Sequence, residues 1–271
     1  SCEYLGEAGV GWANYGKQLS FTQDFPGMLA GIGSIDLIGD IGCQGYYAKA
    51  VYGQTDAPYI AVHPVDHAGE KVFIGQWRFT DAVHSWSWNG LAGRTVKVDV
   101  YANAPTVELF QDGKSLGKKS VEDWMATYDV TYADGELKAV SYDASGKEIG
   151  TDVLRSAGNT VKLQLTADKD QLAAGSRDLL YVSIAIADEN GIPHHLKNKT
   201  VNVSVEGAAD LFGLGSAQVK MDDLMPYVGT STMTCGGKAL AVLRSTEQTG
   251  DVTITVSAEG LEPAVLTVPC K

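Results

Sequence analysis

The chain has 271 residues, 44% hydrophobic and 20% charged, which is ordinary for a globular protein with room for two sizeable cores. Its net charge of −12 argues against nucleic acid and anionic membranes as partners, because both require clusters of Lys and Arg. No apolar run approaches the roughly 20 residues that span a bilayer, so no membrane partner is expected.

The first fifty-odd residues contain two glycine-rich motifs but no complete domain. Glu3-Tyr4-Leu5-Gly6-Glu7 comes first, and Ile35-Asp36-Leu37-Ile38-Gly39 ends an apolar run that begins at Ile32. The apolar run predicts a buried strand or loop, and residues 44–53 predict a short helix rich in Tyr and Ala. One helix cannot bury this run alone, so we expect the chain to be the tail of a larger protein.

These motifs resemble the end of the catalytic barrel in glycoside hydrolases of the β-galactosidase and β-glucuronidase superfamily, family 2. There the last barrel strand runs into an Asp-Tyr-Leu-Gly-Glu motif, and the final helix follows an Ile-Asp-Leu-x-Gly pattern. Here Glu3 stands where the family usually has Asp, and Gly42-Cys43 replaces the usual Pro/Lys pair. The resemblance implies that residues 1–55 are a remnant of the end of a (β/α)8 barrel: its last strand, loop and helix.

The segment between Val51 and Val72 is rich in Pro, Asp and Gly, which predicts a linker and a loop. His63 and His67 flank Pro64 and do not share a helix face. We therefore expect no metal site there.

Short strands separated by Gly-containing turns follow from Lys71, and they predict an immunoglobulin-like antiparallel β-sandwich over residues 56–157. Val96, Val98 and Val100 alternate along one expected strand, and Asp112-Gly113 is a strong hairpin signal. The expected strands are 71–79, 95–100, 106–110, 115–121, 128–132, 137–142 and 148–154.

A polar break at residues 156–159 separates this domain from a second immunoglobulin-like sandwich, expected over residues 158–271. Its clearest strand has Leu180, Val182, Ile184 and Ile186 on one face. Residues 220–234 form its longest irregular loop, and loops of that length are often functional. The other expected strands are 161–166, 201–205, 239–243, 252–256 and 264–268. The fold class is thus mainly β.

Both predicted sandwiches resemble the modules that follow the barrel in the same enzymes. In the first, the resemblance is carried by Trp86-Ser87-Trp88-Asn89-Gly90 and by Val107-Glu108-Leu109-Phe110-Gln111-Asp112-Gly113. In the second, it is carried by the order of Leu165-Thr166-Ala167-Asp168, Gly213-Leu214-Gly215 and Gly237-Lys238-Ala239-Leu240-Ala241.

A retaining glycosidase needs two carboxyl groups ~5–5.5 Å apart. Glu3 and Glu7 are the one local pair worth testing, but an extended chain would place them ~13 Å apart. The resemblance implies that the catalytic glutamates lie on earlier barrel strands, which this chain lacks. We therefore assign no catalytic residue, metal ligand or cofactor, and keep Glu3 and Glu7 as candidates for substrate binding or a structural role.

Trp86 and Trp88 are the other candidates for substrate binding, because aromatic platforms bind sugars. They are two residues apart on an expected strand and would point to the same face. The alternative is a buried aromatic row that fills the core. Exposure of the rings decides between the two interpretations.

The four cysteines are Cys2, Cys43, Cys235 and Cys270, and they show neither zinc spacing nor a disulfide framework. The main expectation is free thiols in a reducing compartment. A Cys235–Cys270 bridge is the pairing worth checking. Whether the protein is cytoplasmic or secreted stays open.

The resemblance to family 2 implies an accessory C-terminal part of a bacterial glycoside hydrolase that cleaves terminal β-linked sugars. It would support the upstream catalytic barrel, reach its carbohydrate substrate through the parent enzyme, and offer a surface for homo-oligomers. The alternative is a non-catalytic carbohydrate-binding or cell-surface adhesion module. Exposure of the Trp86/Trp88 face would favour that alternative.

Overall fold

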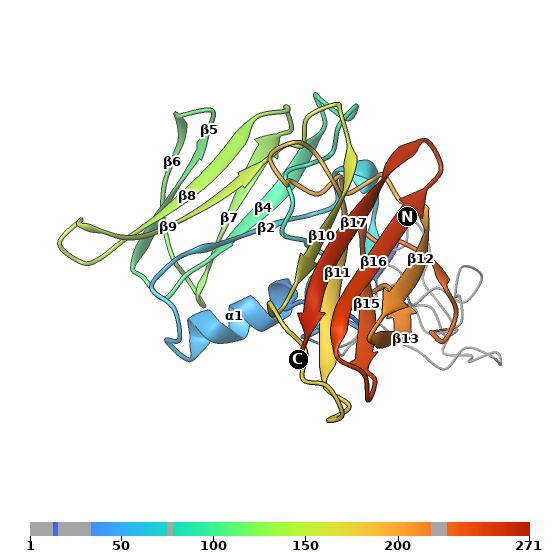
Figure 1. The fold of residues 1–271 in the computed structure, drawn as a ribbon. Helices are drawn as coiled ribbons and strands as arrows, with labels where there is room; N and C mark the ends of the chain where they lie inside the picture. The colour runs from blue at the N-terminus through green and yellow to red at the C-terminus, as the bar shows by residue number, and fades with distance from the viewer. Residues whose placement is uncertain (1–12, 16–33, 75–77, 218–226) are drawn as a thin grey trace. The chain divides into compact units, whose positions relative to one another are not determined.

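The computed structural model describes residues 13–15, 34–74, 78–217 and 227–271. The chain divides into two compact units, an N-terminal unit that ends at Ser156 and a C-terminal unit that begins at Ala157. Antiparallel β-strands dominate both units (Figure 1). Within these residues, no helix has the length and apolarity needed to cross a bilayer.

The described part of the N-terminal unit contains one α-helix and three antiparallel sheets. The sheet orders are β1-β3, β2-β4-β7 and β6-β5-β8-β9. Its elements are β1 (Ala13–Tyr15), α1 (Cys43–Val51), β2 (Tyr59–Val62), the 3₁₀-helix η1 (Val65–His67), β3 (Val72–Ile74), β4 (Thr95–Tyr101), β5 (Thr106–Gln111), β6 (Lys114–Ser120), β7 (Met125–Thr131), β8 (Glu136–Tyr142) and β9 (Glu148–Arg155).

Alternation and turn chemistry account for the regular strands of this unit. Val96, Val98 and Val100 of β4 are all buried, as their spacing predicts. Asp112 and Gly113 both adopt left-handed backbone conformations, with φ of 49° and 76°. Two such residues make the turn that matches the twist of an antiparallel hairpin, so the predicted hairpin of β5 and β6 is confirmed.

Strand β6 forms an edge of its four-stranded sheet. Its sequence is polar, and Lys114, Lys118 and Lys119 are exposed along it. Charged side chains on an edge strand discourage pairing with other strands.

For residues 51–79, one expectation is wrong and another is confirmed in part. Residues 59–62 were expected to belong to a linker, but they form β2, and all four are buried. Four apolar residues are too few to show the alternation of a strand. The Pro and Asp residues on either side are typical of loops and so predicted a linker. Of the strand expected over residues 71–79, Val72–Ile74 form β3, residues 78 and 79 are not in a strand, and residues 75–77 lie outside the described residues.

Helix α1 confirms the helix predicted over residues 44–53. The apolar run before it ends in a turn, in which Oδ1 of Asp36 accepts hydrogen bonds from the N–H groups of Ile38 and Asp40. Ile35 is 59% exposed and Leu37 is 47% exposed, so the expectation that this run is buried is wrong for the chain described here.

The described part of the C-terminal unit consists of two four-stranded antiparallel sheets, ordered β10-β11-β15-β13 and β14-β12-β16-β17. One aliphatic cluster draws residues from both sheets. Leu180, Val182, Ile184 and Ile186 are at most 1% exposed, which confirms the predicted inward face of β11. The strands are β10 (Lys162–Ala167), β11 (Leu179–Ala187), β12 (Thr200–Gly207), β13 (Ala209–Gly215), β14 (Ser231–Met233), β15 (Lys238–Ser245), β16 (Gly250–Ala258) and β17 (Leu261–Cys270).

The segment expected to be an irregular loop, residues 220–234, contains the short strand β14, which pairs with β12. Residues 218–226 lie outside the described residues. Gly207, at the end of β12, has a φ of +100° and packs so closely on Asp251 that a Cβ atom would collide with the Asp251 carbonyl oxygen.

Candidate functional site

The residues predicted to bind substrate do not come together as a site in the described chain. Glu3 and Glu7 lie outside the described residues. Trp86 and Trp88 are both 0% exposed, so the structure favours the interpretation of a buried aromatic core. The prediction that they lie on a strand is wrong, because residues 84–88 form an irregular segment.

A tyrosine hydroxyl holds this irregular segment in place. The Tyr132 hydroxyl accepts a hydrogen bond from the Trp88 N–H at 2.9 Å and donates one to the Asp134 carboxylate at 2.6 Å. The Ser156 hydroxyl donates to the Trp86 carbonyl. Burial and the bond to Asp134 raise the pKa of Tyr132 to about 12, so the phenol stays protonated and serves as a structural link.

His63 lies between two buried carboxylates. Its Nδ1 is 2.6 Å from Oδ1 of Asp81, and its Nε2 is 2.9 Å from Oδ2 of Asp99. Thr127 donates a further hydrogen bond to Asp99. Burial lowers the pKa of His63, but the bonds to Asp81 and Asp99 outweigh it and raise the pKa to about 9. Both ring nitrogens therefore carry protons, and the cluster is a buried ion triad.

Both ring nitrogens of His63 are taken up by these carboxylates. In the described ranges, no group of three or more His, Cys, Asp or Glu side chains is arranged to hold a metal ion. The two carboxylates are also unsuited to glycoside hydrolysis, because both bond the same imidazole and are at most 9% exposed.

A second cluster lies beside α1 and is mainly aromatic. The rings of Tyr46 and Tyr59 stack with centroids 3.9 Å apart, and the His84 ring lies 4.1 Å from Tyr59. Cys43 contacts the Tyr59 hydroxyl through its sulfur at 3.9 Å. Burial raises the pKa of the Cys43 thiol to about 12, so the thiol stays protonated at neutral pH.

The cysteine expectations need correction. Cys235 is disulfide-bonded, whereas Cys43 and Cys270 are free and buried. The Cys235–Cys270 bridge is therefore excluded. The expectation of free thiols holds for Cys43 and Cys270 but is wrong for Cys235.

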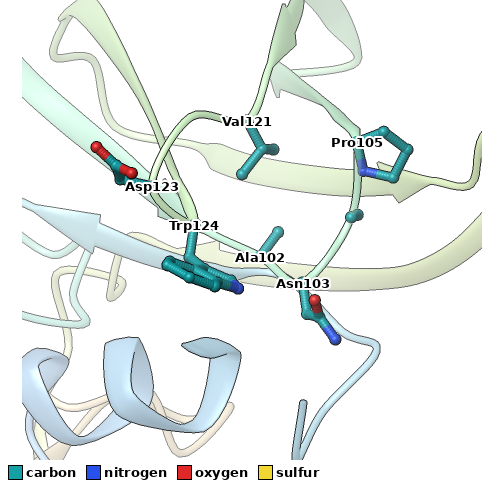
Figure 2. A pocket seen from close by; sticks show the side chains of 7 residues that line it. Ala102, Asn103, Pro105, Val121, Asp123 and Trp124 are labelled. Carbon is teal, nitrogen blue, oxygen red and sulfur yellow. The ribbon is translucent and has the colours of Figure 1, made fainter. Parts of the chain in front are cut away.

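An open pocket of about 360 Å³ lies beside the connection between β6 and β7, two strands of different sheets (Figure 2). In Figure 2 the Trp124 ring extends beside Ala102, Val121 stands opposite, and the Asp123 carboxylate stands at the rim on the side away from Asn103. The lining residues are Ala102, Asn103, Ala104, Pro105, Val121, Asp123 and Trp124.

Trp124 is exposed because of the turn in which it sits. Asp123 and Trp124 have φ of 48° and 59°, and the flanking residues Glu122 and Met125 exchange two backbone hydrogen bonds. The Tyr47 hydroxyl of α1 donates to the Asp123 carbonyl at 3.0 Å. The Ala102 N–H donates to the Trp124 carbonyl at 3.0 Å. The turn is thus fixed from two sides.

Trp124 is not among the substrate-binding residues predicted from the sequence. The signal that could have found it is a tryptophan in the short connection between β6 and β7, residues 121–124, where small or polar turn residues such as Gly, Asn and Asp are usual. A bulky residue at such a position extends away from the sheet and into solvent. Trp124 is 39% exposed, in contrast to Trp86 and Trp88.

Two family profiles match the chain. Glycoside hydrolase family 2 C-terminal domain 5 matches residues 163–267. A domain of unknown function (DUF4982) matches residues 93–150. The chain is a glycoside hydrolase family 2 C-terminal region. Among known proteins, this family 2 region is 27% identical over 99% of its length to β-galactosidase BoGH2A of Bacteroides ovatus, and spans 32% of that protein.

Solved structures show the same relationship. The family 2 region matches a glycosyl hydrolase family 2 member from Bacteroides cellulosilyticus with a TM-score of 0.81 and 33% identity, over 90% of this chain and 32% of that one. A β-glycosidase from Bacteroides vulgatus matches with a TM-score of 0.73 and 26% identity, over 89% of this chain and 28% of that one. The region therefore corresponds to about a third of the length of these relatives.

Proposed function

We propose that the chain is a non-catalytic accessory part of a longer β-galactosidase-like glycoside hydrolase, in which it supports the catalytic barrel. The observation that carries this proposal is the match of residues 163–267 to a family 2 C-terminal domain. The limited share of the relatives that the chain spans, 32% for the β-galactosidase of Bacteroides ovatus, supports it. The substrate of the whole protein would be a terminal β-linked sugar.

The proposal includes three domains. Residues 1–55 would be the end of the barrel, and residues 56–157 and 158–271 would be two immunoglobulin-like sandwiches. For the last, support comes from the aliphatic cluster shared by its two sheets, since sandwiches bury the alternating inner faces of both sheets. The apolar side chains exposed at Ile35 and Leu37 would contact the barrel or a second copy of the chain.

The test is an activity assay of the 271-residue chain with aryl β-galactoside, β-glucuronide and β-mannoside substrates. No turnover above the blank is expected, because hydrolysis requires two positioned carboxyl groups at the anomeric carbon. A Glu3→Gln/Glu7→Gln double variant is the matched control. Turnover that the double variant abolishes would show that the chain carries its own active site and would overturn the proposal.

The supporting role has a test of its own in the full-length protein. Deleting residues 158–271 is expected to lower the melting temperature of the barrel while leaving the pH profile of turnover unchanged, because the catalytic groups would lie elsewhere. An unchanged melting temperature after the deletion would contradict the proposed supporting role.

A further inference from the structure

The Trp124 pocket has a feature that structural support does not require: an exposed tryptophan ring on a strained turn. Large aromatic side chains normally contribute to stability by being buried, as Trp86 and Trp88 do here. Trp124 leaves 39% of its surface exposed and forms part of a pocket wall. Its position therefore points to contact with a ligand.

The backbone conformation supports the same conclusion. Asp123 and Trp124 both adopt the left-handed conformation that Gly and Asn tolerate best. Strain of this kind persists only where surrounding contacts fix it, and it clusters at ligand-binding sites. Here the fixing contacts are the bonds from Tyr47 to the Asp123 carbonyl and from Ala102 to the Trp124 carbonyl. They hold the backbone of the turn in place before any ligand arrives.

The lining suits a ligand with an apolar face and a polar rim. Trp124, Val121 and Pro105 offer apolar surface, whereas the Asn103 amide can donate and accept hydrogen bonds and the Asp123 carboxylate can accept them. The pocket volume of about 360 Å³ is at the small end of the range for small-molecule sites, ~300–1,000 Å³. A pyranose ring has both properties, with C–H groups on its face and hydroxyl groups around its edge.

A cationic ligand fits the lining less well. Sites for quaternary ammonium groups enclose the cation with several aromatic faces. The lining of this pocket contains one aromatic ring, Trp124, and its other walls are aliphatic or an amide apart from the rim carboxylate. Because the single Trp124 ring cannot enclose a cation, and one rim carboxylate can also accept hydrogen bonds from hydroxyl groups, the lining favours a neutral polyhydroxylated ligand.

We propose that the Trp124 pocket binds one pyranose ring of a neutral glycan. The sugar face stacks on the Trp124 indole, and its hydroxyl groups bond the Asn103 amide and the Asp123 carboxylate. This proposal rests on the proposed function in one respect: the β-galactosidase-like relationship is the reason that a galactoside is the first ligand tested. It concerns binding, not hydrolysis.

The experiment is a titration of the 271-residue chain with methyl β-D-galactopyranoside and methyl β-D-glucopyranoside, followed by two-dimensional NMR of the indole N–H signals. Choline serves as the cationic counter-probe. A glycoside is expected to shift the Trp124 signal and leave those of Trp86 and Trp88 in place. Trp124→Gly, which also relieves the turn, is expected to weaken binding at least about tenfold.

Two further variants make the result specific. Phe212→Ala removes an aromatic side chain that is 50% exposed in the other unit, and it should leave the affinity unchanged. Asp123→Asn keeps the Trp124 ring, and Asn tolerates the left-handed conformation at position 123. It should weaken glycoside binding about threefold, because the hydrogen bond from a sugar hydroxyl to the carboxylate is lost. If Trp124→Gly does not fold, Asp123→Asn tests the proposal in its place.

Binding of neither glycoside, preferential binding of choline, or glycoside binding that survives both pocket substitutions would overturn this proposal. Glycoside binding without turnover would support it. Turnover in the assay above would instead overturn the accessory role, so failures of the two proposals are distinguishable.

Discussion

The two compact units fill their cores with different side chains. The N-terminal unit buries Trp86, Trp88, Tyr101 and Tyr132 together with the carboxylates of Asp81 and Asp99. In the described part of the C-terminal unit, every buried hydrophobic residue is aliphatic or a cysteine.

The difference follows from how each unit satisfies its backbone. The aliphatic core lies between strands whose ladders pair their own N–H and C=O groups, so its side chains need no polar atoms. The N-terminal unit includes the irregular segment 84–88, whose backbone groups are bonded by the hydroxyls of Tyr132 and Ser156. In segment 84–88, buried hydroxyl groups thus take the place of regular strand pairing.

The largest effect is expected from truncation of the aromatic core. Trp86→Ala should destabilise the N-terminal unit by about 3–5 kcal/mol, because it removes a fully buried indole that packs edge-on against Tyr132. Hydrogen exchange measured by mass spectrometry should show lost protection in β4, β7 and β8.

Leu180→Ala is the matched control in the aliphatic core. It should destabilise by about 2–5 kcal/mol and reduce protection in β11 and β15 instead. If either substitution lowered protection equally in both units, the two cores would unfold as one and the comparison would fail.

Substitution of one glycine in the C-terminal unit should destabilise the protein nearly as much. Gly207→Ala combines a φ of +100° with a collision against the Asp251 carbonyl oxygen, so a cost of about 3 kcal/mol is expected. Gly260→Ala shares the positive φ, at +74°, but meets nothing within 4 Å, so about 1 kcal/mol is expected. Urea denaturation compares them, and equal costs would show that the close approach is unimportant.

The two units should respond to pH in opposite directions through their histidines. The pKa of His63 is raised from 6.5 to about 9, so its contribution is complete below pH 6.5 and is lost as pH rises through 9. Burial, then the charge of Lys238, lowers the pKa of His195 to about 4, so its contribution is lost as pH falls from 6.5 towards 4. Each contribution is at most about 3 kcal/mol.

Urea denaturation at several pH values tests this contrast. Tryptophan fluorescence reports on the N-terminal unit, and methyl NMR signals of Ile184 and Ile254 report on the C-terminal unit. In a His63→Gln variant, the loss of fluorescence-detected stability between pH 6.5 and 9 should largely disappear. An unchanged pH dependence in that variant would mean that the ion triad does not drive it.

The smallest effect on stability is expected at the pocket. Trp124→Gly should change the free energy of unfolding by no more than about 1 kcal/mol, because relief of the left-handed conformation offsets the lost contacts of a partly exposed ring. Thermal unfolding measures this. A loss as large as that of Trp86→Ala would mean that Trp124 is a core residue.

The sequence predicted the elements whose side chains alternate or whose turns have special backbone conformations. The inward face of β11 and the Asp112-Gly113 hairpin are examples, since each depends on a few neighbouring residues. Strand β2 was missed because four apolar residues carry no readable period, and their burial comes from partners far along the chain.

The site was harder to predict than the fold. Trp86 and Trp88 have the spacing of one face of a strand, but hydrogen bonds from residues 132 and 156 impose another conformation. The pocket residues come from two separate loops, and Trp124 is exposed only because Tyr47 and Ala102 fix its turn. Such long-range contacts leave no periodic pattern in the sequence.

The lysines of β6 have a consequence for how concentrated solutions of this protein behave. A sheet edge offers unpaired N–H and C=O groups to any extended segment that arrives, including an unfolded copy of the same chain. Lys114, Lys118 and Lys119 must lose their hydration before such a segment can pair with β6. Replacing them with threonine or valine would leave the fold intact while turning this edge into a template for aggregation, so shelf life and crowding tolerance depend on these three side chains.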